Sequence, residues 1–209
     1  MKVSHMKKLD AHYMRYFRVM DPDKEVTVIH PVQDNGKPHV DVYVCKANEK
    51  RPYQILATFG ASEYAMPGKI YGNLTNRNEY VTFAPADWDF DDPKYSWLVQ
   101  WLLITAHYTD MTGEGITYSH TLDFSTVVEE NGDDDFNMAA VQLMFPQKLD
   151  VSVLRAKLGL FRTATVLHMM PITAEELHTV REGGQLEAVI DRIYDNKAEK
   201  FAFLSARKR

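Results

Sequence analysis

Three residues of this sequence have side chains that could together carry out hydrolysis: Ser62, Glu63 and His120. A serine becomes a nucleophile when a histidine takes its proton and a carboxylate orients that histidine. Ser62 and Glu63 follow the apolar run Tyr53–Phe59, which we expect Gly60 to end with a positive φ, so they are predicted to lie where a strand stops at a sheet edge. A plain strand followed by a tight turn would give the same pattern. The sequence contains no G-x-S-x-G, Walker, G-x-G-x-x-G or H-E-x-x-H motif.

Residues with metal-ligating side chains are scattered along the chain. His107 and Asp110 lie three residues apart on an expected helix, and His120 follows later. A metal site needs further ligands, and the spacing supplies none. We therefore expect no metal and no cofactor. The single cysteine, Cys45, cannot form an internal disulfide and is expected to be a buried free thiol, which favours the cytoplasm.

The charges of the chain are strongly segregated. Residues 78–147 carry thirteen acidic side chains and one basic side chain, Lys94, for a net charge of −12, whereas the rest of the chain carries +7. The acids are Glu79, Asp87, Asp89, Asp91, Asp92, Asp110, Glu114, Asp123, Glu129, Glu130, Asp133, Asp134 and Asp135. This asymmetry predicts a basic protein partner for the acidic segment, and not nucleic acid. The alternative is that these acids occupy solvated loops that keep the protein soluble.

The order of the expected elements predicts a single α+β domain with a mixed or largely antiparallel sheet packed against helices. Residues 1–24 form an amphipathic helix of this domain, 25–195 its main body and 196–209 a tail. Within residues 1–24 apolar residues recur at helical spacing, and Asp21-Pro22 is expected to end the helix. Strands are expected at residues 25–30, 39–46, 53–59, 78–84, 139–145 and 162–170, the last ending at Pro171. Turns are expected at Asn35-Gly36 and at residues 131–135.

Two later helices begin at recognisable caps. Asp91 or Asp92, with Pro93 in the first turn, begins a helix with a wide apolar face. Thr173 and Glu176 form a capping box at the start of a second, which Gly183-Gly184 closes. A last amphipathic helix contains Leu186, Val189, Ile190 and Ile193. No apolar run approaches the roughly 20 residues of a membrane span, and no apolar signal-peptide core follows Met1, so no membrane association is expected.

Several stretches resemble the Suppressor of fused domain, in the same order along the chain. Thr58-Phe59-Gly60-Ala61-Ser62, followed by Met66, resembles its T-x-G-x-S…M signature. Glu79-Tyr80 resembles its R-x-E-[LY] strand, with Asn78 before the glutamate and Arg77 as the nearby arginine. Pro85-Ala86-Asp87-Trp88 resembles the L-P-x-x-W turn of the family. Tyr118-Ser119-His120-Thr121 resembles its G-H-T segment, and Pro171–Leu177 resembles its P-I-T-x-x-E-[LM] helix start. Ala84 stands in place of the usual leucine and Ser119 in place of the glycine, and the resemblance covers about residues 25–193.

This resemblance implies protein binding and no catalysis. Animal members are cytoplasmic regulators that hold a transcription factor between this domain and a second one. This chain is too short for the second domain, so we do not expect the transcription-factor role. Short bacterial relatives resemble immunity proteins, which neutralise a toxin of a polymorphic toxin system, often a basic nuclease. We therefore expect a cytoplasmic antitoxin that is steered to a basic toxin by its acidic surface and then buries aromatic anchors. The alternatives are a small hydrolase that uses Ser62, Glu63 or His120, and a regulatory scaffold for a host protein.

The residues expected to contact the partner combine these acids with the signature turns. Trp88 and Tyr118 are the candidate anchors, although Trp88 could instead pack in the core at the end of its strand. His120 is expected to order its own loop. The full set is Ser62, Glu63, Trp88, Asp89, Asp91, Asp92, Tyr118, His120, Asp133, Asp134 and Asp135.

Overall fold

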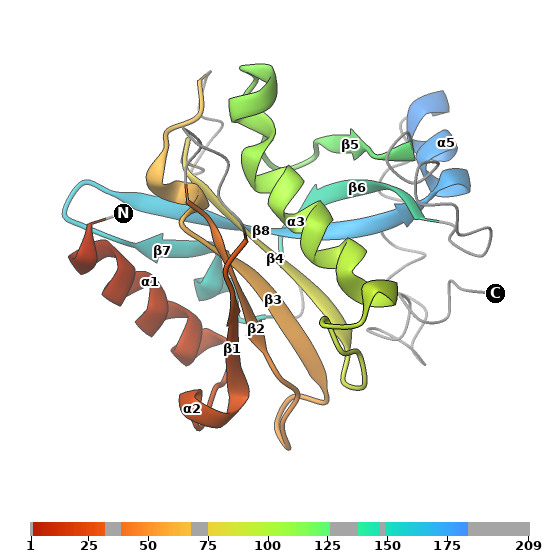
Figure 1. The fold of residues 1–209 in the computed structure, drawn as a ribbon. Helices are drawn as coiled ribbons and strands as arrows, with labels where there is room; N and C mark the ends of the chain where they lie inside the picture. The colour runs from red at the N-terminus through yellow and green to blue at the C-terminus, as the bar shows by residue number, and fades with distance from the viewer. Residues whose placement is uncertain (1, 32–38, 68–74, 126–137, 147–148, 184–209) are drawn as a thin grey trace.

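A single sheet forms the centre of the molecule in the computed structural model, which describes residues 2–31, 39–67, 75–125, 138–146 and 149–183 (Figure 1). Within these residues eight strands pair in the order β1-β2-β3-β4-β8-β6-β5, and β7 pairs with β8. The strands are β1 (Val26–Ile29), β2 (Asp41–Cys45), β3 (Tyr53–Phe59), β4 (Asn78–Pro85), β5 (Thr121–Asp123), β6 (Met138–Met144), β7 (Arg155–Lys157) and β8 (Thr163–Thr173). The β4–β8 pairing is parallel and the others are antiparallel. The predicted α+β fold with a mixed, mostly antiparallel sheet is therefore confirmed.

The first half of the chain follows the predicted order of elements. Helix α1 (Val3–Tyr16) buries Leu9 and Tyr13, as its amphipathic pattern predicts. It ends earlier than predicted, because Arg18 adopts a left-handed φ of 56°, and Pro22 instead begins the short helix α2 (Pro22–Glu25). The 3-10 turn η1 (Ala61–Glu63) follows β3.

Helix α3 (Pro93–Thr112) begins directly after Asp92, one of the two predicted caps. The Asp92 carboxylate accepts a hydrogen bond from the Lys94 amide at 2.9 Å, and Pro93 occupies the first helical position. Gly113 ends the helix with a φ of 74°. None of the helices described is long and apolar enough to cross a membrane.

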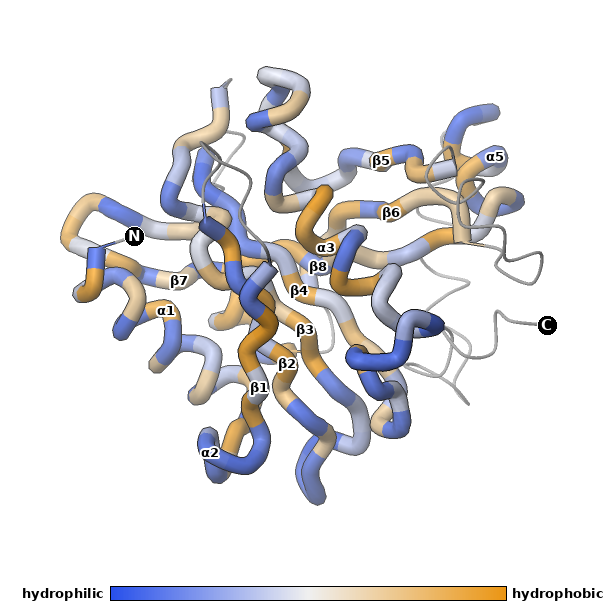
Figure 2. Tube along the Cα trace, viewed as in Figure 1, coloured by the Kyte–Doolittle hydropathy of each residue, from blue (hydrophilic) through white to orange (hydrophobic). Residues whose placement is uncertain are grey.

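The two faces of the sheet are covered by different helices. Helix α3 packs Leu98, Trp101 and Leu102 against one face, where they join Val44 and Leu56 in a hydrophobic cluster. Helix α1 packs Leu9 and Tyr13 into a second cluster, with Ile55, Phe83 and Val166. The hydrophobic residues of the strands accordingly lie between the helices (Figure 2). Cys45 is buried in the second cluster as a free thiol, as predicted.

Strand β8 is longer than the sequence predicts and runs through Pro171 to Thr173. Beyond His168 the described strands pair with β8 on one side only, through β6. In this part of the strand Pro171 pairs with Val141 of β6, so Pro171 lies inside β8 and does not end it.

The predicted capping box follows directly after Pro171. The Thr173 hydroxyl accepts from the Glu176 amide at 3.2 Å, the Glu176 carboxylate accepts from the Thr173 amide at 2.8 Å, and helix α5 (Ala174–Gly183) begins there. The 3-10 turn η2 (Val151–Leu154) precedes β7. The predicted turns at 35–36 and 131–135 and the helix at 186–193 lie outside the described residues.

Candidate functional site

The turn after β3 has the geometry predicted for Gly60. Its φ is 124°, and a Cβ at this position would lie 2.6 Å from the backbone oxygen of His39. A side chain is therefore excluded both by the backbone conformation and by the close approach of the segment that leads into β2. The turn carries the chain into η1 and brings Ser62 into the interior, where it is 0% exposed.

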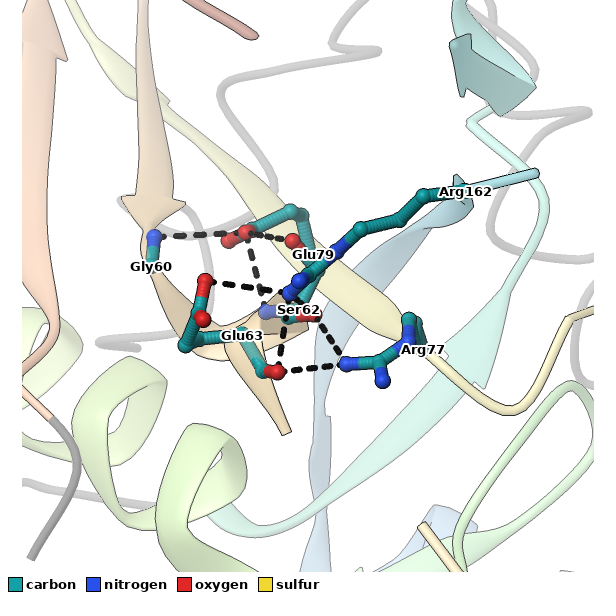
Figure 3. Close-up of polar contacts among 6 residues, drawn as sticks. All are labelled: Gly60, Ser62, Glu63, Arg77, Glu79 and Arg162. Atoms are coloured by element: carbon teal, nitrogen blue, oxygen red, sulfur yellow. Dashed lines mark hydrogen bonds and ion pairs between the residues drawn. The ribbon is translucent and has the colours of Figure 1, made fainter. Parts of the chain in front are cut away.

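Ser62 faces a buried carboxylate, that of Glu79 at the start of β4 (Figure 3). One carboxylate oxygen accepts hydrogen bonds from the Gly60 amide at 3.2 Å, the Ser62 amide at 3.0 Å and the Ser62 hydroxyl at 2.6 Å. The other accepts from the Thr58 hydroxyl at 2.7 Å. We call Thr58, Gly60, Ser62 and Glu79 the Glu79 centre. It explains the T-x-G-x-S spacing, since each of the three specified residues donates to the same carboxylate.

The charge of Glu79 is stabilised by neutral groups. Burial raises the pKa of Glu79 above its usual range, and the hydrogen bonds from Ser62, Thr58 and Gly60 oppose that rise. All four donors are hydroxyls or amides. The centre therefore joins the end of β3 to the start of β4, and Thr58, Ser62 and Glu79 are all 0% exposed.

Two arginines hold the outer side of the same turn. Arg77 donates to the carbonyl oxygens of Ser62, at 3.0 Å, and of Glu63. Arg162, which directly precedes β8, donates to the same two carbonyls at 2.8 Å and to the Glu63 carboxylate at 3.0 Å. Burial and the nearby Arg162 charge lower the pKa of Arg77. The arginines thus connect η1 to β4 and β8.

The proposed hydrolytic residues do not form one constellation within the described structure. The Ser62 hydroxyl is bonded to Glu79, and the Glu63 carboxylate to Arg162. His120 is exposed, and its Nδ1 lies 3.2 Å from the Thr117 amide and 3.1 Å from the Thr117 oxygen, so it orders its own turn as expected. Neither of these contacts joins His120 to Ser62.

Trp88 packs in the core, which the sequence analysis gave as the alternative to an exposed anchor. It is 6% exposed, stacks on Tyr95 with ring centroids 4.6 Å apart, and its carbonyl accepts from the Gln54 side chain at 2.6 Å. Tyr118 is 39% exposed and stacks on Phe145 at 4.2 Å. Of the two candidate anchors, Tyr118 alone therefore presents a substantial surface in this conformation.

The acids of the segment 78–147 lie in different environments. Glu79 is fully buried, and Asp123 pairs with Arg181. Asp89, Asp91 and Asp92 are exposed, with Asp89 accepting from the Asp91 amide at 3.1 Å. Asp133, Asp134 and Asp135 lie outside the described residues.

Asp89 and Asp91 lie beside a pocket of about 120 Å³ between the Trp88 turn and the first strands. We call it the acid-rimmed pocket. Trp88, Phe90, Ile29 and Val44 supply its apolar lining, and the other lining residues are Thr27, Lys46, Gln54, Asp89 and Asp91. Its two aspartates outnumber its one lysine, Lys46, so beside the aspartates its chemistry suits a long side chain with an apolar stem and a positive head.

Two residues have roles that were not predicted from the sequence. Glu79 was counted only among the acids of the charged segment and a strand motif, but its carboxylate accepts the hydrogen bonds of the signature residues. Arg162 was predicted only as part of a strand, but it also donates to the carbonyl oxygens of the η1 turn. Leu160 and Phe161, between β7 and β8, are 89% and 97% exposed, and their only sequence signal is an apolar pair beside Gly159. Ser119 has a φ of 74°, which explains why the family motif has glycine there.

Residues able to hold a metal come together at a place that the sequence did not indicate. His107 contacts Asp110 at 3.5 Å on α3, and His120 is bonded within its own turn. His30, His39 and Asp41 instead form a cluster at the end of the β1–β2 pair, with their ligand atoms all within 4.8 Å of one another. No signal in the spacing of the histidines indicated this cluster, which depends on strand pairing.

Comparisons with known proteins identify the sequence family and the fold. The sequence pattern of the Suppressor of fused protein family matches residues 36–202. The fold is similar to the crystal structure of a Suppressor of fused homolog from Neisseria gonorrhoeae, with a TM-score of 0.64 and 9% identity over 90% of this chain and 89% of that one. It is also similar to a chain of the Sufu–Fu complex, with a TM-score of 0.59 and 13% identity over 90% and 83%. No curated protein matches the sequence.

Proposed function

The chain belongs to the Suppressor of fused family, and we propose that it is an immunity protein that neutralises a basic protein toxin by direct contact. A relative with this fold was crystallised as a Sufu–Fu complex, which supports binding of a protein partner. The signature residues Thr58, Gly60 and Ser62 support the same proposal, because their hydrogen bonds serve the fold and no reacting group.

The acid-rimmed pocket carries this proposal. Asp89 and Asp91 are exposed beside an apolar surface formed by Trp88 and Phe90. Exposed carboxylates attract a cationic partner over roughly one Debye length, about 8 Å at physiological salt. A lysine or arginine side chain of the toxin then packs its stem on the aromatic lining and pairs its head with the two aspartates. Trp88 acts here as a buried wall of the site, and Tyr118 remains an exposed contact candidate.

A cell-survival experiment tests the function itself. The toxin candidate is the product of the neighbouring reading frame, expressed with and without this chain. We expect co-expression to restore growth, and the two purified proteins to form a complex. If growth is not restored although both proteins are made and folded, the immunity function is wrong.

A kinetic experiment tests the surface. In the double variant Asp89→Asn/Asp91→Asn, association with the toxin should slow several-fold at low salt, dissociation should change less, and the difference should shrink as salt rises. The matched control is Asp110→Asn/Glu114→Gln, which removes the same charge at the far end of α3. A helix of 20 residues spans about 30 Å, so the two pairs of acids are well separated. Equal slowing in both double variants, or a wild-type rate independent of salt, would contradict the assigned surface.

A further inference from the structure

His30, His39 and Asp41 converge on one point at an edge of the sheet. The Nδ1 atom of His30 lies 2.8 Å from Oδ1 of Asp41, and the Nε2 atom of His39 lies 2.7 Å from the same oxygen. The Asp41 side chain is 12% exposed, whereas the imidazoles are 68% and 44% exposed. One oxygen of a nearly buried carboxylate therefore faces nitrogens of two exposed imidazoles.

Strand pairing and the signature turn build this cluster. In the β1–β2 register Ile29 pairs with Val42, so the next residue on β1, His30, comes beside Asp41. His39 lies two residues before Asp41, and its backbone oxygen packs against Gly60. The contact with Gly60 holds the segment leading into β2 close to the end of β3, which fixes the approach of His39.

We propose that His30, His39 and Asp41 form a zinc-binding site. Imidazole nitrogen and carboxylate oxygen are the ligands that Zn²⁺ takes at about 2.0–2.2 Å. Such bonds place tetrahedral ligand atoms roughly 3.3 Å apart. To admit the ion, each nitrogen withdraws from Asp41 Oδ1 by about half an ångström, and the two nitrogens, which lie within 4.8 Å of each other, come to a similar spacing. Both belong to exposed side chains.

The proton balance is simple. In the hydrogen-bonded state each facing nitrogen carries the proton that it donates to Asp41. On zinc binding, a neutral imidazole carries its proton on the other ring nitrogen, so that Nδ1 of His30 and Nε2 of His39 become ligands. Two nitrogens and one carboxylate favour Zn²⁺ over Mg²⁺ or Ca²⁺, which prefer all-oxygen sites. Three protein ligands leave the fourth zinc position to water.

The test uses the untagged full chain, stripped with a chelator and titrated with zinc chloride by calorimetry. We expect one zinc ion per chain, no heat with magnesium chloride, and a loss of affinity of more than about 10-fold in both His30→Ala and His39→Ala. The control is His107→Ala, which removes a histidine that also contacts an aspartate and should leave zinc affinity unchanged.

A second readout identifies the ligands. Cobalt(II) in the same site should give the strong visible absorption of four-coordinate geometry, and His30→Ala and His39→Ala should abolish it. Thermal melting confirms that these exposed-histidine variants are folded. Absence of zinc binding by the wild type, or equal binding by the wild type and both variants, would overturn the proposal. The test involves no toxin, so its result does not depend on the proposed immunity function.

Discussion

Glu79 lies at the start of β4 and Asp89 lies beyond its end, and both add the same formal charge to the acidic segment, but their environments are opposite. Glu79 is 0% exposed and accepts four hydrogen bonds from neutral donors. Asp89 is exposed beside the acid-rimmed pocket. The first carboxylate serves the fold and the second is available to a partner, so a count of charges along the chain combines two different physical roles.

Removal of the Glu79 carboxylate should have the largest effect on stability. Glu79→Ala leaves two buried hydroxyls and two buried amides without their acceptor, and each unsatisfied group costs about 1–3 kcal/mol unless water replaces the carboxylate. We expect a loss of about 3–5 kcal/mol in the free energy of unfolding, measured by urea titration. The control is Asp89→Ala, and equal midpoints for the two variants would remove the distinction between the two carboxylates.

The turn that supports the Glu79 centre should be nearly as sensitive. In Gly60→Ala the new Cβ would meet the His39 oxygen at 2.6 Å, in a backbone conformation with φ of 124°. Strain and backbone displacement together should cost about 2–4 kcal/mol. Gly113→Ala is the matched control, since Gly113 also has a positive φ but has nothing within 4 Å of the added atom. It should cost about 1 kcal/mol, and a Gly60 variant no less stable than this control would contradict the close approach.

The arginine beside the centre should contribute more than an arginine at the surface. Arg162 has an 18% exposed side chain and bonds two carbonyls and the Glu63 carboxylate. Arg162→Ala should therefore cost about 1.5–3 kcal/mol. Arg181, which is 61% exposed in its pair with Asp123, should cost no more than about 1 kcal/mol as Arg181→Ala. Thermal melting of both variants measures these two losses of stability. A larger loss for Arg181→Ala than for Arg162→Ala would show that burial does not determine how much an arginine contributes.

The pH dependence of stability should reveal the buried charge. Burial raises the pKa of Glu79 in the folded protein, so between about pH 4 and that raised pKa the native state retains a proton that the unfolded chain has released. The free energy of unfolding therefore falls as pH rises through this window and is level above it. Glu79→Gln lacks this titration, so the wild type should lose stability relative to the variant as pH rises from 4. Parallel urea-stability curves for the two proteins would contradict the raised pKa.

The exposed aspartates should have the smallest effect on folding. Asp89→Asn/Asp91→Asn should change the free energy of unfolding by no more than about 0.5 kcal/mol per residue, because both side chains are exposed. Chemical denaturation with the wild type as reference measures this. A loss of several kcal/mol would assign these acids to the fold, as for Glu79.

Features that depend on neighbouring residues could be predicted from the sequence. Strand β3, the positive φ of Gly60, the Asp92 cap and the Thr173–Glu176 capping box follow from contacts within a few residues along the chain. Such contacts are present in the local pattern, and they were predicted correctly. The short strands β5 and β7 were missed because three residues are too few to show a period.

Contacts between elements that are distant in the chain could not be predicted from the sequence. The order β4-β8-β6 brings Arg162 to Ser62 from 100 residues away, the β3–β4 pairing turns Ser62 toward Glu79, and the β1–β2 register sets His30 beside Asp41. Pro171 lies inside β8, where the pairing with β6 sets it opposite Val141. The physical reason is the same in each case: burial and strand pairing, which depend on residues far apart in the chain, determine whether a charge is held inside, paired or exposed.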